Sequence, residues 1–107
     1  MELDQYRIVL VNLDPTVGSE IKKTRPCVII SPDELNFNIK TITVAPMTTQ
    51  SHSYPTRILV YQNKKKGWVV LDQIRTIDKQ RVIKSYDKLT SKEVAEVKRV
   101  IKETFVD

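Results

Sequence analysis

Apolar and β-branched residues along the first two thirds of the chain gather in short runs, and proline, aspartate or lysine-rich turns separate these runs. Runs of this length and composition are typical of β-strands. The pattern predicts five strands, at residues 7–13, 27–31, 41–45, 56–60 and 68–71. Residues 14–25 have no clear period and predict a long loop, while Pro46 is expected to end the third strand. Residues 63–67 are expected to form a hairpin turn whose lysines are solvated.

The C-terminal region has a different pattern, with apolar residues at helical spacing and lysine or glutamate between them. The apolar positions are Leu89, Val94, Val97, Ile101 and Phe105. Thr90 followed by Glu93 forms a capping-box sequence, in which each side chain can bond the backbone N–H of the other residue. These signals predict a helix over residues 91–105, with Leu89 and Val94 packing across its start.

The order of these elements predicts the fold class. A chain of 107 residues is expected to form one domain, residues 1–107, with one modest core. Regularly spaced short strands followed by one helix favour a mainly β protein with some α structure. The specific expectation is a small, partly open antiparallel barrel with the C-terminal helix packed against it.

Composition indicates the cellular compartment of the protein and the kind of partner that it binds. The formal net charge is +5, and it lies in the second half, where residues 51–107 carry thirteen Lys and Arg against seven Asp and Glu. A basic half favours a polyanion or an acidic protein as partner. The single cysteine, Cys27, favours a reducing compartment. The polar N-terminus lacks a signal-peptide pattern and no apolar run is long enough for a bilayer, so a cytoplasmic protein without membrane association is expected.

Several common catalytic arrangements are excluded by the residue inventory. His52 is the only histidine, so a pair of histidines within one chain is impossible. One histidine and one cysteine do not make a usual zinc site, and no glycine-rich phosphate loop is present. His52 is expected to be an exposed loop residue. The remaining candidates are polar residues at strand ends, where rigid scaffolds commonly carry their sites.

Three of these polar segments occur in a recognisable order. Residues 13–20 read LDPTVGSE and are followed by TRP at residues 24–26. Residues 46–51 read PMTTQS, followed by YP at residues 54–55, and residues 72–78 read DQIRTID. Together these motifs resemble the signature of MazF/PemK-type toxins, and the resemblance spans almost the whole chain. Family members commonly place glutamine and glycine between the Glu and the Arg-Pro, where this chain has IKKT at residues 21–24.

The resemblance implies a fold, an activity and partners. It implies a small SH3-like antiparallel barrel of about five or more strands with a C-terminal helix. It further implies a homodimer, an acidic antitoxin of the MazE kind, and sequence-specific cleavage of single-stranded RNA, chiefly mRNA, without a metal or other cofactor. The substrate's own 2′-hydroxyl would attack the adjacent phosphorus, which leaves a 2′,3′-cyclic phosphate and a 5′-hydroxyl.

Carried over residue by residue, the resemblance also implies a catalytic set. Arg25 would hold the phosphate and stabilise the dianionic phosphorane, because its guanidinium is planar and permanently charged. The alternative for Arg25 is a structural ion pair with Glu20. Thr48 would donate its hydroxyl to a phosphate oxygen. The general base is left open between Glu20, which shares the loop with Arg25, and Asp72.

The remaining polar residues of the motifs, with the two lysines of the loop between them, are assigned to contacts with RNA: Ser19, Lys22, Lys23, Thr49, Gln50 and Gln73. Tyr54 and Trp68 could stack on bases, although packed or half-buried positions are the expectation for both. Two other functions stay open on the same barrel, because a fold does not determine an activity. One is a toxin that poisons DNA gyrase, and the other is a barrel that binds RNA without cleaving it.

Overall fold

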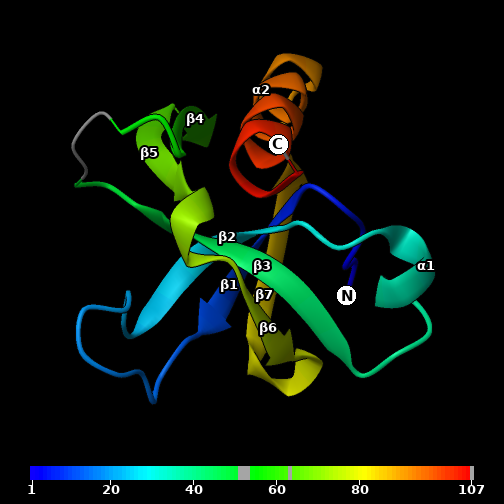
Figure 1. The fold of residues 1–107 in the computed structure, drawn as a ribbon. Coiled ribbons are helices and arrows are strands. Elements are labelled where there is room, and N and C mark those ends of the chain that lie inside the picture. Colours follow the sequence, from blue (N-terminus) through cyan, green and yellow to red (C-terminus); the bar gives the residue numbers. More distant parts are fainter. Residues whose placement is uncertain (51–53, 63, 107) are drawn as a thin grey trace.

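The computed structural model describes residues 1–50, 54–62 and 64–106, and Figure 1 shows a curled antiparallel sheet with one long helix against it. The seven strands are β1 (Arg7–Asn12), β2 (Thr24–Ile29), β3 (Thr41–Thr48), β4 (Arg57–Gln62), β5 (Lys65–Val70), β6 (Arg75–Asp78) and β7 (Val82–Lys88). The helices are α1 (Asp33–Asn36) and α2 (Ser91–Ile101). The 3-10 turns η1 (Leu71–Gln73) and η2 (Lys79–Arg81) flank β6, and a π-helical turn, η3 (Lys102–Val106), continues α2.

The sheet has the strand order β4-β5-β3-β2-β1-β7, and every pairing is antiparallel. Strand β3 is the branch point, because β6 pairs with its first half and β5 with its last two residues. Residue Cys27 of β2 lies opposite Pro46 of β3, and Val28 lies opposite Ala45. No pairing joins β4 to β7 among the described residues, so the barrel is partly open, as the sequence predicted.

Both faces of the central strands are buried, and each face has its own hydrophobic cluster. On β1, Ile8 belongs to one cluster while Val9 and Val11 belong to the other. This division follows from the strand geometry, in which successive side chains point to opposite faces. The first cluster also takes Val97 and Val100 from α2. The second cluster takes Ile77 from β6, and the partly buried side chains of Leu3, Ile21 and Val82 pack against it.

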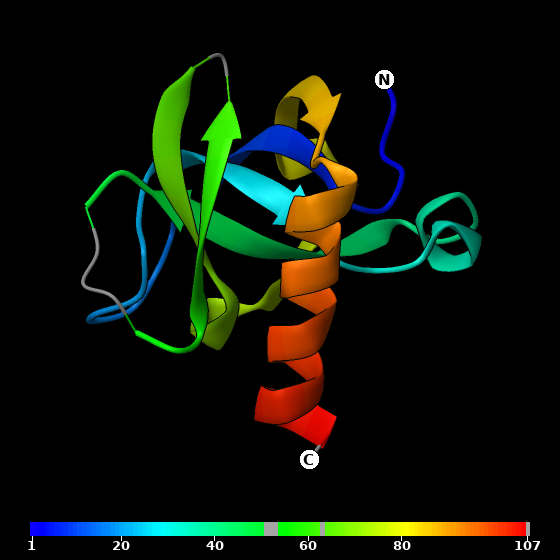
Figure 2. The same cartoon turned by 90° about the horizontal axis from the view of Figure 1, so that it is seen from above.

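Helix α2 begins at the predicted position and lies beside the β4–β5 hairpin (Figure 2). Its capping box is complete, since the Thr90 hydroxyl accepts from the Glu93 N–H and the Glu93 carboxylate accepts from the Thr90 N–H. A second oxygen of Glu93 accepts a hydrogen bond from the Tyr61 N–H of edge strand β4, at 3.0 Å. Leu89 and Val94 lie in the same cluster, as expected for residues on either side of a helix start. No helix in the described ranges combines the length and the apolar character needed to cross a membrane.

The structure corrects three boundaries. β3 does not end at Pro46 but continues to Thr48. Residues 45 and 46 pair with neither β5 nor β6. On the side of β3 that faces β5 and β6, no strand-to-strand hydrogen bond therefore needs the N–H that proline lacks. β2 begins at Thr24, three residues earlier than predicted. Residues 65–67 are part of β5 and not of a turn, since Gln62 already pairs with Lys65.

Two strands and a short helix were not predicted. β7 is an edge strand rich in lysine and has no fully buried residue, so it has no apolar alternation to detect. β6 has four residues, of which only Ile77 is buried. The single turn of α1 begins at Asp33, two residues after the predicted end of the second strand at residue 31.

Candidate active site

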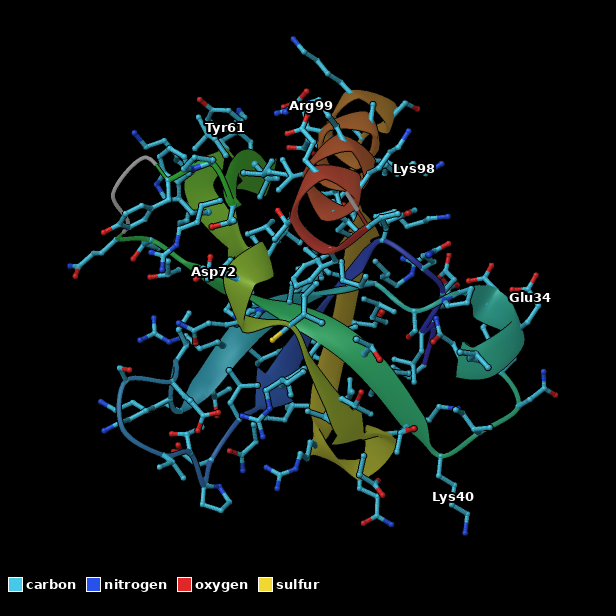
Figure 3. All side chains as sticks on the ribbon, in the orientation of Figure 1. Glu34, Lys40, Tyr61, Asp72, Lys98 and Arg99 are labelled. Carbon is cyan, nitrogen blue, oxygen red and sulfur yellow. The ribbon has the colours of Figure 1, made fainter. Side chains whose placement is uncertain are left out.

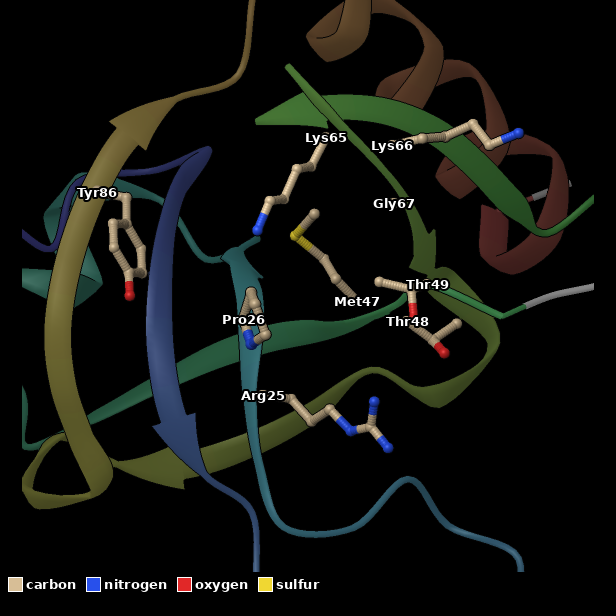
Figure 4. Close-up of a pocket in the computed structure, with 9 residues that line it drawn as sticks. All are labelled: Arg25, Pro26, Met47, Thr48, Thr49, Lys65, Lys66, Gly67 and Tyr86. Carbon is tan, nitrogen blue, oxygen red and sulfur yellow. The ribbon is translucent and has the colours of Figure 1, made fainter. Parts of the chain in front are cut away.

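Arg25 and Thr48 are brought together by the pairing of β2 with β3. The antiparallel register places Cys27 opposite Pro46, and continuing it by two residues places Arg25 opposite Thr48. The two side chains lie close to each other at one end of a pocket, and the guanidinium is directed toward Thr48 (Figure 4). A register slip of one residue would turn one of the two to the other face of the sheet. The pairing therefore fixes which residues can meet here.

We name this cavity the Arg25 pocket, and its volume is about 300 Å³. It is lined by Arg25, Pro26, Met47, Thr48, Thr49, Lys65, Lys66, Gly67 and Tyr86. Of these nine described residues three are cationic and none is acidic. The floor is apolar, with buried Met47 at its centre. Such a cavity suits an anion that carries an apolar group.

The guanidinium of Arg25 retains most of its hydrogen-bonding capacity. Its Nε donates to the carbonyl oxygen of Lys22 at 3.2 Å, which ties the base of the side chain to the preceding loop. Arg25 forms no ion pair within the described part of the chain, so the expected alternative, a structural pair with Glu20, is wrong. The two terminal nitrogens of the guanidinium lie on the side of Thr48 (Figure 4).

Thr48 has a structural role as well as a place in the pocket. Its hydroxyl donates to the carbonyl oxygen of Gln50 at 3.1 Å and accepts from the Gln50 N–H at 3.2 Å. These two bonds shape the chain where it leaves β3. A phosphate oxygen beside Thr48 would compete with the Gln50 carbonyl for the hydroxyl proton.

A second cavity, which we name the Asp72 pocket, shares β3 as a wall through Pro46 and has a volume of about 260 Å³. It is lined by Leu13, Glu20, Ile21, Pro46, Asp72, Gln73, Ile74 and Arg75. Both candidate bases, Glu20 and Asp72, lie here and not in the Arg25 pocket. The structure thus divides the predicted catalytic set into two neighbouring pairs.

Asp72 is already engaged on both carboxylate oxygens. Oδ1 accepts from the Thr56 hydroxyl at 2.8 Å and from Arg57 Nε at 3.4 Å, and Oδ2 accepts from the other end of the same guanidinium at 3.4 Å. Partial burial raises the pKa of Asp72, but the hydrogen bonds from Arg57 and Thr56 outweigh it, so the pKa lies below the usual value. Asp72 is therefore a weaker base than an ordinary carboxylate, and it joins η1 to the start of β4.

The loop between β1 and β2 is held to the barrel by the third sequence motif. The side-chain oxygen of Gln73 accepts from the Ile21 N–H at 2.9 Å, and Arg75 donates to the Leu13 carbonyl at 3.1 Å. Arg81 also donates to the carbonyl of Asn12, at 3.2 Å. The motif at residues 72–78 thus fixes the loop that carries Glu20 and leads into Arg25.

Glu20 closes a tight turn inside that loop. Its Oε1 accepts from the Val17 N–H at 2.6 Å, and its own N–H donates to the Val17 carbonyl at 3.2 Å. Gly18 lies within this turn at φ +59°, a conformation that favours glycine. The turn occupies one carboxylate oxygen of Glu20, and the side chain is exposed.

The predicted RNA-binding residues are mostly exposed. Ser19, Lys22 and Lys23 lie on the loop, and Thr49 and Gln50 follow β3. Only Gln73 is partly buried and committed to a hydrogen bond within the protein.

The two aromatic candidates differ in exposure. Trp68 is half-buried, while Tyr54 is 51% exposed and lies under the Arg57 guanidinium. Tyr54 therefore has about half of its surface covered, in part by Arg57, and the expected half-buried position holds for both residues. The expectation for His52, an exposed loop position, concerns a residue outside the described ranges.

Cys27 is fully buried, and burial raises the pKa of its thiol to about 12. A thiol held in its protonated form is not a nucleophile at neutral pH. Among the described residues, which exclude His52, no group of three or more His, Cys, Asp or Glu side chains could hold a metal ion.

Sequence reasoning missed Lys65 and Tyr86 as lining residues of the Arg25 pocket. The three consecutive lysines had been interpreted as a solvated turn. A signal was available for Lys65, because strand alternation places it on the same face as Gly67 and Val69 once β5 is known to begin at residue 65. Tyr86 lies on β7, a strand that was not predicted, so no pattern indicated it.

Comparison with known protein sequences identifies relatives over most of the chain. The sequence model of the PemK-like, MazF-like toxins of type II toxin–antitoxin systems matches residues 4–105. The endoribonuclease toxin MazF of Escherichia coli (strain K12) is 34% identical over 74 residues, which cover 69% of this chain and 67% of that protein. The endoribonuclease MazF of Staphylococcus saprophyticus is 34% identical over 100 residues, which cover 88% and 83% respectively.

Solved structures share the fold. MazF from Deinococcus radiodurans superposes with a TM-score of 0.87 at 22% identity, covering 98% of this chain and 97% of that one. A mycobacterial endoribonuclease in complex with its cognate antitoxin superposes with a TM-score of 0.83 at 15% identity, covering 98% and 96%. At these identities the likeness confirms the barrel with its C-terminal helix.

Proposed function

The chain belongs to the family of PemK-like, MazF-like toxins of type II toxin–antitoxin systems, and we propose that it is an endoribonuclease that an antitoxin neutralises. The observation that carries the proposal is the Arg25 pocket, where Arg25 and Thr48 meet beside cationic walls with no acidic lining residue. The names of the relatives at 34% identity support the reaction class.

The reaction we propose uses the 2′-hydroxyl of single-stranded RNA as the nucleophile. Its oxygen bonds to the adjacent phosphorus, and the bond from phosphorus to the 5′-oxygen breaks. A base takes the 2′-hydroxyl proton, and the 5′-oxygen gains a proton as it leaves. The products are a 2′,3′-cyclic phosphate and a 5′-hydroxyl. This sequence of steps draws both the nucleophile and the leaving group from the RNA itself.

Arg25 is the electrostatic centre of this scheme. Two of its nitrogens lie on the side of Thr48, where they can bond two non-bridging oxygens of the phosphorane. A preorganised donor of this kind contributes about 3–4 kcal/mol to transition-state stabilisation. Thr48 adds a hydroxyl donor when its proton turns from the Gln50 carbonyl to the phosphate.

We assign the base to Glu20 and a positioning role to Asp72. Both oxygens of Asp72 accept from Thr56 or Arg57, and its pKa lies below the usual value. Glu20 uses Oε1 for the turn at Val17, which leaves Oε2 for a substrate proton. The exposed loop side chains Ser19, Lys22 and Lys23, with Thr49 and Gln50, would contact the RNA on either side of the cut.

The partners follow from the charge of this surface. An antitoxin with an acidic segment could occupy the Arg25 pocket and block it, since the charged side chains that line it are all cationic. We place the activity in the cytoplasm, where RNA is available and a lone cysteine stays reduced. The homodimer stays a prediction, which sedimentation of the purified protein would test.

The proposal is tested by incubating a long single-stranded RNA with purified, antitoxin-free protein in excess EDTA, comparing wild type with Arg25→Ala. We expect the wild type alone to cut at a short recurrent sequence and to leave cyclic phosphate ends. Absence of cutting by folded wild-type protein in EDTA and in Mg²⁺ would overturn the proposal. RNA binding without cleavage would then favour the non-catalytic barrel, and lethality retained by Arg25→Ala would favour gyrase poisoning.

A further inference from the structure

We infer that Lys65 is a second phosphate-binding group, which holds a phosphate adjacent to the scissile one. The Arg25 pocket then takes one nucleotide as a unit, with a phosphate on Arg25, the next phosphate on Lys65, and the base against the apolar floor between them. This inference rests on the proposed function, because it names a substrate contact of the same site.

The direction of the lysine side chains singles out Lys65 from its neighbours. Lys65 extends across the pocket above Met47 toward Pro26, whereas the ammonium group of Lys66 is directed away from the pocket (Figure 4). Lys64 does not line the pocket. This difference follows from strand alternation, because Lys65 shares a face with Gly67 and Lys66 shares the opposite face with Trp68.

The ammonium group of Lys65 has no counter-ion within the described part of the chain. It is an exposed side chain on the rim, and no carboxylate lines the cavity that it crosses. Two cations that face one small cavity from opposite ends repel each other. A ligand with two separated negative charges would relieve that repulsion, and adjacent phosphates of a nucleic acid strand supply them.

The floor between the two cations suits a base. It is formed by Pro26, Met47 and Gly67, with Tyr86 at the far side. Gly67 leaves this space open, because a Cβ there would lie 3.3 Å from Met47 Cε and would push the end of that side chain by a few tenths of an ångström. A larger side chain at residue 67 would fill the cavity under Lys65. An apolar floor of this kind binds a flat base by stacking and van der Waals contact.

The experiment compares three substitutions that each remove one positive charge: Lys65→Gln, Lys64→Gln in the same hairpin, and Lys98→Gln on the exposed face of α2. A short RNA containing the mapped cut sequence is used for single-turnover cleavage. The same RNA with a 2′-deoxy nucleotide at the cut serves for binding. We expect Lys65→Gln to bind about five- to tenfold more weakly, as for loss of one charge-assisted hydrogen bond, with an unchanged rate at saturation.

Salt dependence and phosphate neutralisation identify the contact. The slope of log K against log salt should fall by about 0.7 for Lys65→Gln, as expected when one phosphate contact to a single strand is lost. It should stay at the wild-type value for Lys64→Gln and Lys98→Gln. Replacing each phosphate in turn by a neutral methylphosphonate should reveal one position, next to the cut, that weakens binding to the wild type but not to Lys65→Gln.

The outcomes separate the two proposals. If the wild type cuts the RNA but Lys65→Gln behaves as the two control variants do, the role of Lys65 is wrong and the proposed function stands. If no single phosphate shows the non-additive effect, the assignment of Lys65 to a neighbouring phosphate is overturned. If the wild type does not cut at all, the proposed function itself fails.

Discussion

The two pockets that share β3 as a wall differ in how far their polar groups are already satisfied within the protein. In the Arg25 pocket, Arg25 uses one N–H on a backbone carbonyl, and Lys65 has no counter-ion among the described residues. In the Asp72 pocket, Asp72 accepts on both oxygens and Gln73 accepts from the loop backbone. The Arg25 pocket has donors left for a ligand. The Asp72 pocket uses its polar groups to fix the loop that leads into Arg25.

Glu20 is the strongest test of this difference between the pockets, because it lies in the Asp72 pocket and yet is assigned the role of general base. We expect Glu20→Gln to lower the single-turnover rate about 10²- to 10⁴-fold, the usual contribution of a general base. Glutamine can still accept from the Val17 N–H, so the turn is kept. The acidic limb of the pH–rate profile should disappear in Glu20→Gln and persist in Asp72→Asn.

The control for Glu20→Gln is Glu34→Gln, an exposed residue on α1 at the opposite end of the molecule from Asp72 (Figure 3). It should leave the rate and the pH profile unchanged. If Asp72→Asn and not Glu20→Gln removed the acidic limb, the base would be Asp72, and the division between the pockets would be wrong.

Arg25→Lys tests whether the guanidinium in the Arg25 pocket serves catalysis and not stability. Lysine keeps the charge but lacks the planar fork that reaches two phosphate oxygens. We expect the single-turnover rate to fall about 10²- to 10³-fold, as for loss of one well-placed transition-state donor. Thermal unfolding should change little, because Arg25 makes one exposed hydrogen bond, to the Lys22 carbonyl, and no ion pair with a described residue. A large loss of stability in Arg25→Lys would contradict the view that this guanidinium is reserved for a ligand.

Gln73→Leu tests the supporting role of the second pocket. The substitution leaves the partly buried N–H of Ile21 without its acceptor and should lower the free energy of unfolding by about 1 kcal/mol. The loop should lose its fixed position, so kcat/KM should fall several-fold. Gln80→Leu, at an exposed position on η2, is the matched control. Unchanged stability together with weaker RNA binding would instead support the direct RNA contact first expected of Gln73.

The smallest expected effect is the pH dependence of the Asp72–Arg57 pair. The pKa of Asp72 is lower in the folded protein than its ordinary value of 3.8. Its stabilising contribution is therefore present above that ordinary pKa and is lost as the pH falls through the lower, folded value. We expect Asp72→Asn to unfold more readily than wild type at pH 7, and the difference to shrink below about pH 4. A difference that stayed constant down to pH 2 would exclude the charged pair as its source.

Sequence reasoning was strongest where burial and local signals agree. The apolar runs that form β1, β3 and β4 and the capping box at Thr90 are short-range patterns, and the structure confirms them. β7 was missed because an edge strand with a solvated face can be polar along its whole length. Pro46 was misinterpreted because its tolerance depends on the gap between β5 and β6, which is a tertiary fact.

At the candidate active site, too, sequence reasoning failed where contacts between distant segments decide the outcome. The motifs singled out Arg25 and Thr48, and the pairing of β2 with β3 brings them together. That Asp72 and Gln73 would be committed to internal hydrogen bonds depends on Arg57 and Ile21, which are distant in sequence. The pocket face of Lys65 depends on where β5 begins. None of these relations can be deduced from residue spacing within one motif.

The way the Arg25 pocket is assembled determines when, during synthesis, the chain can first cleave RNA. Its walls come from residues as far apart as Arg25 and Tyr86, and the cluster beneath them is completed by Val97 and Val100 of α2. A nascent chain that lacks α2 cannot bury that cluster, and contacts of such long sequence separation form late in folding. We therefore expect the growing polypeptide to remain inactive until α2 has been made. The mRNA that is being translated would then not be cleaved by the unfinished chain that it encodes.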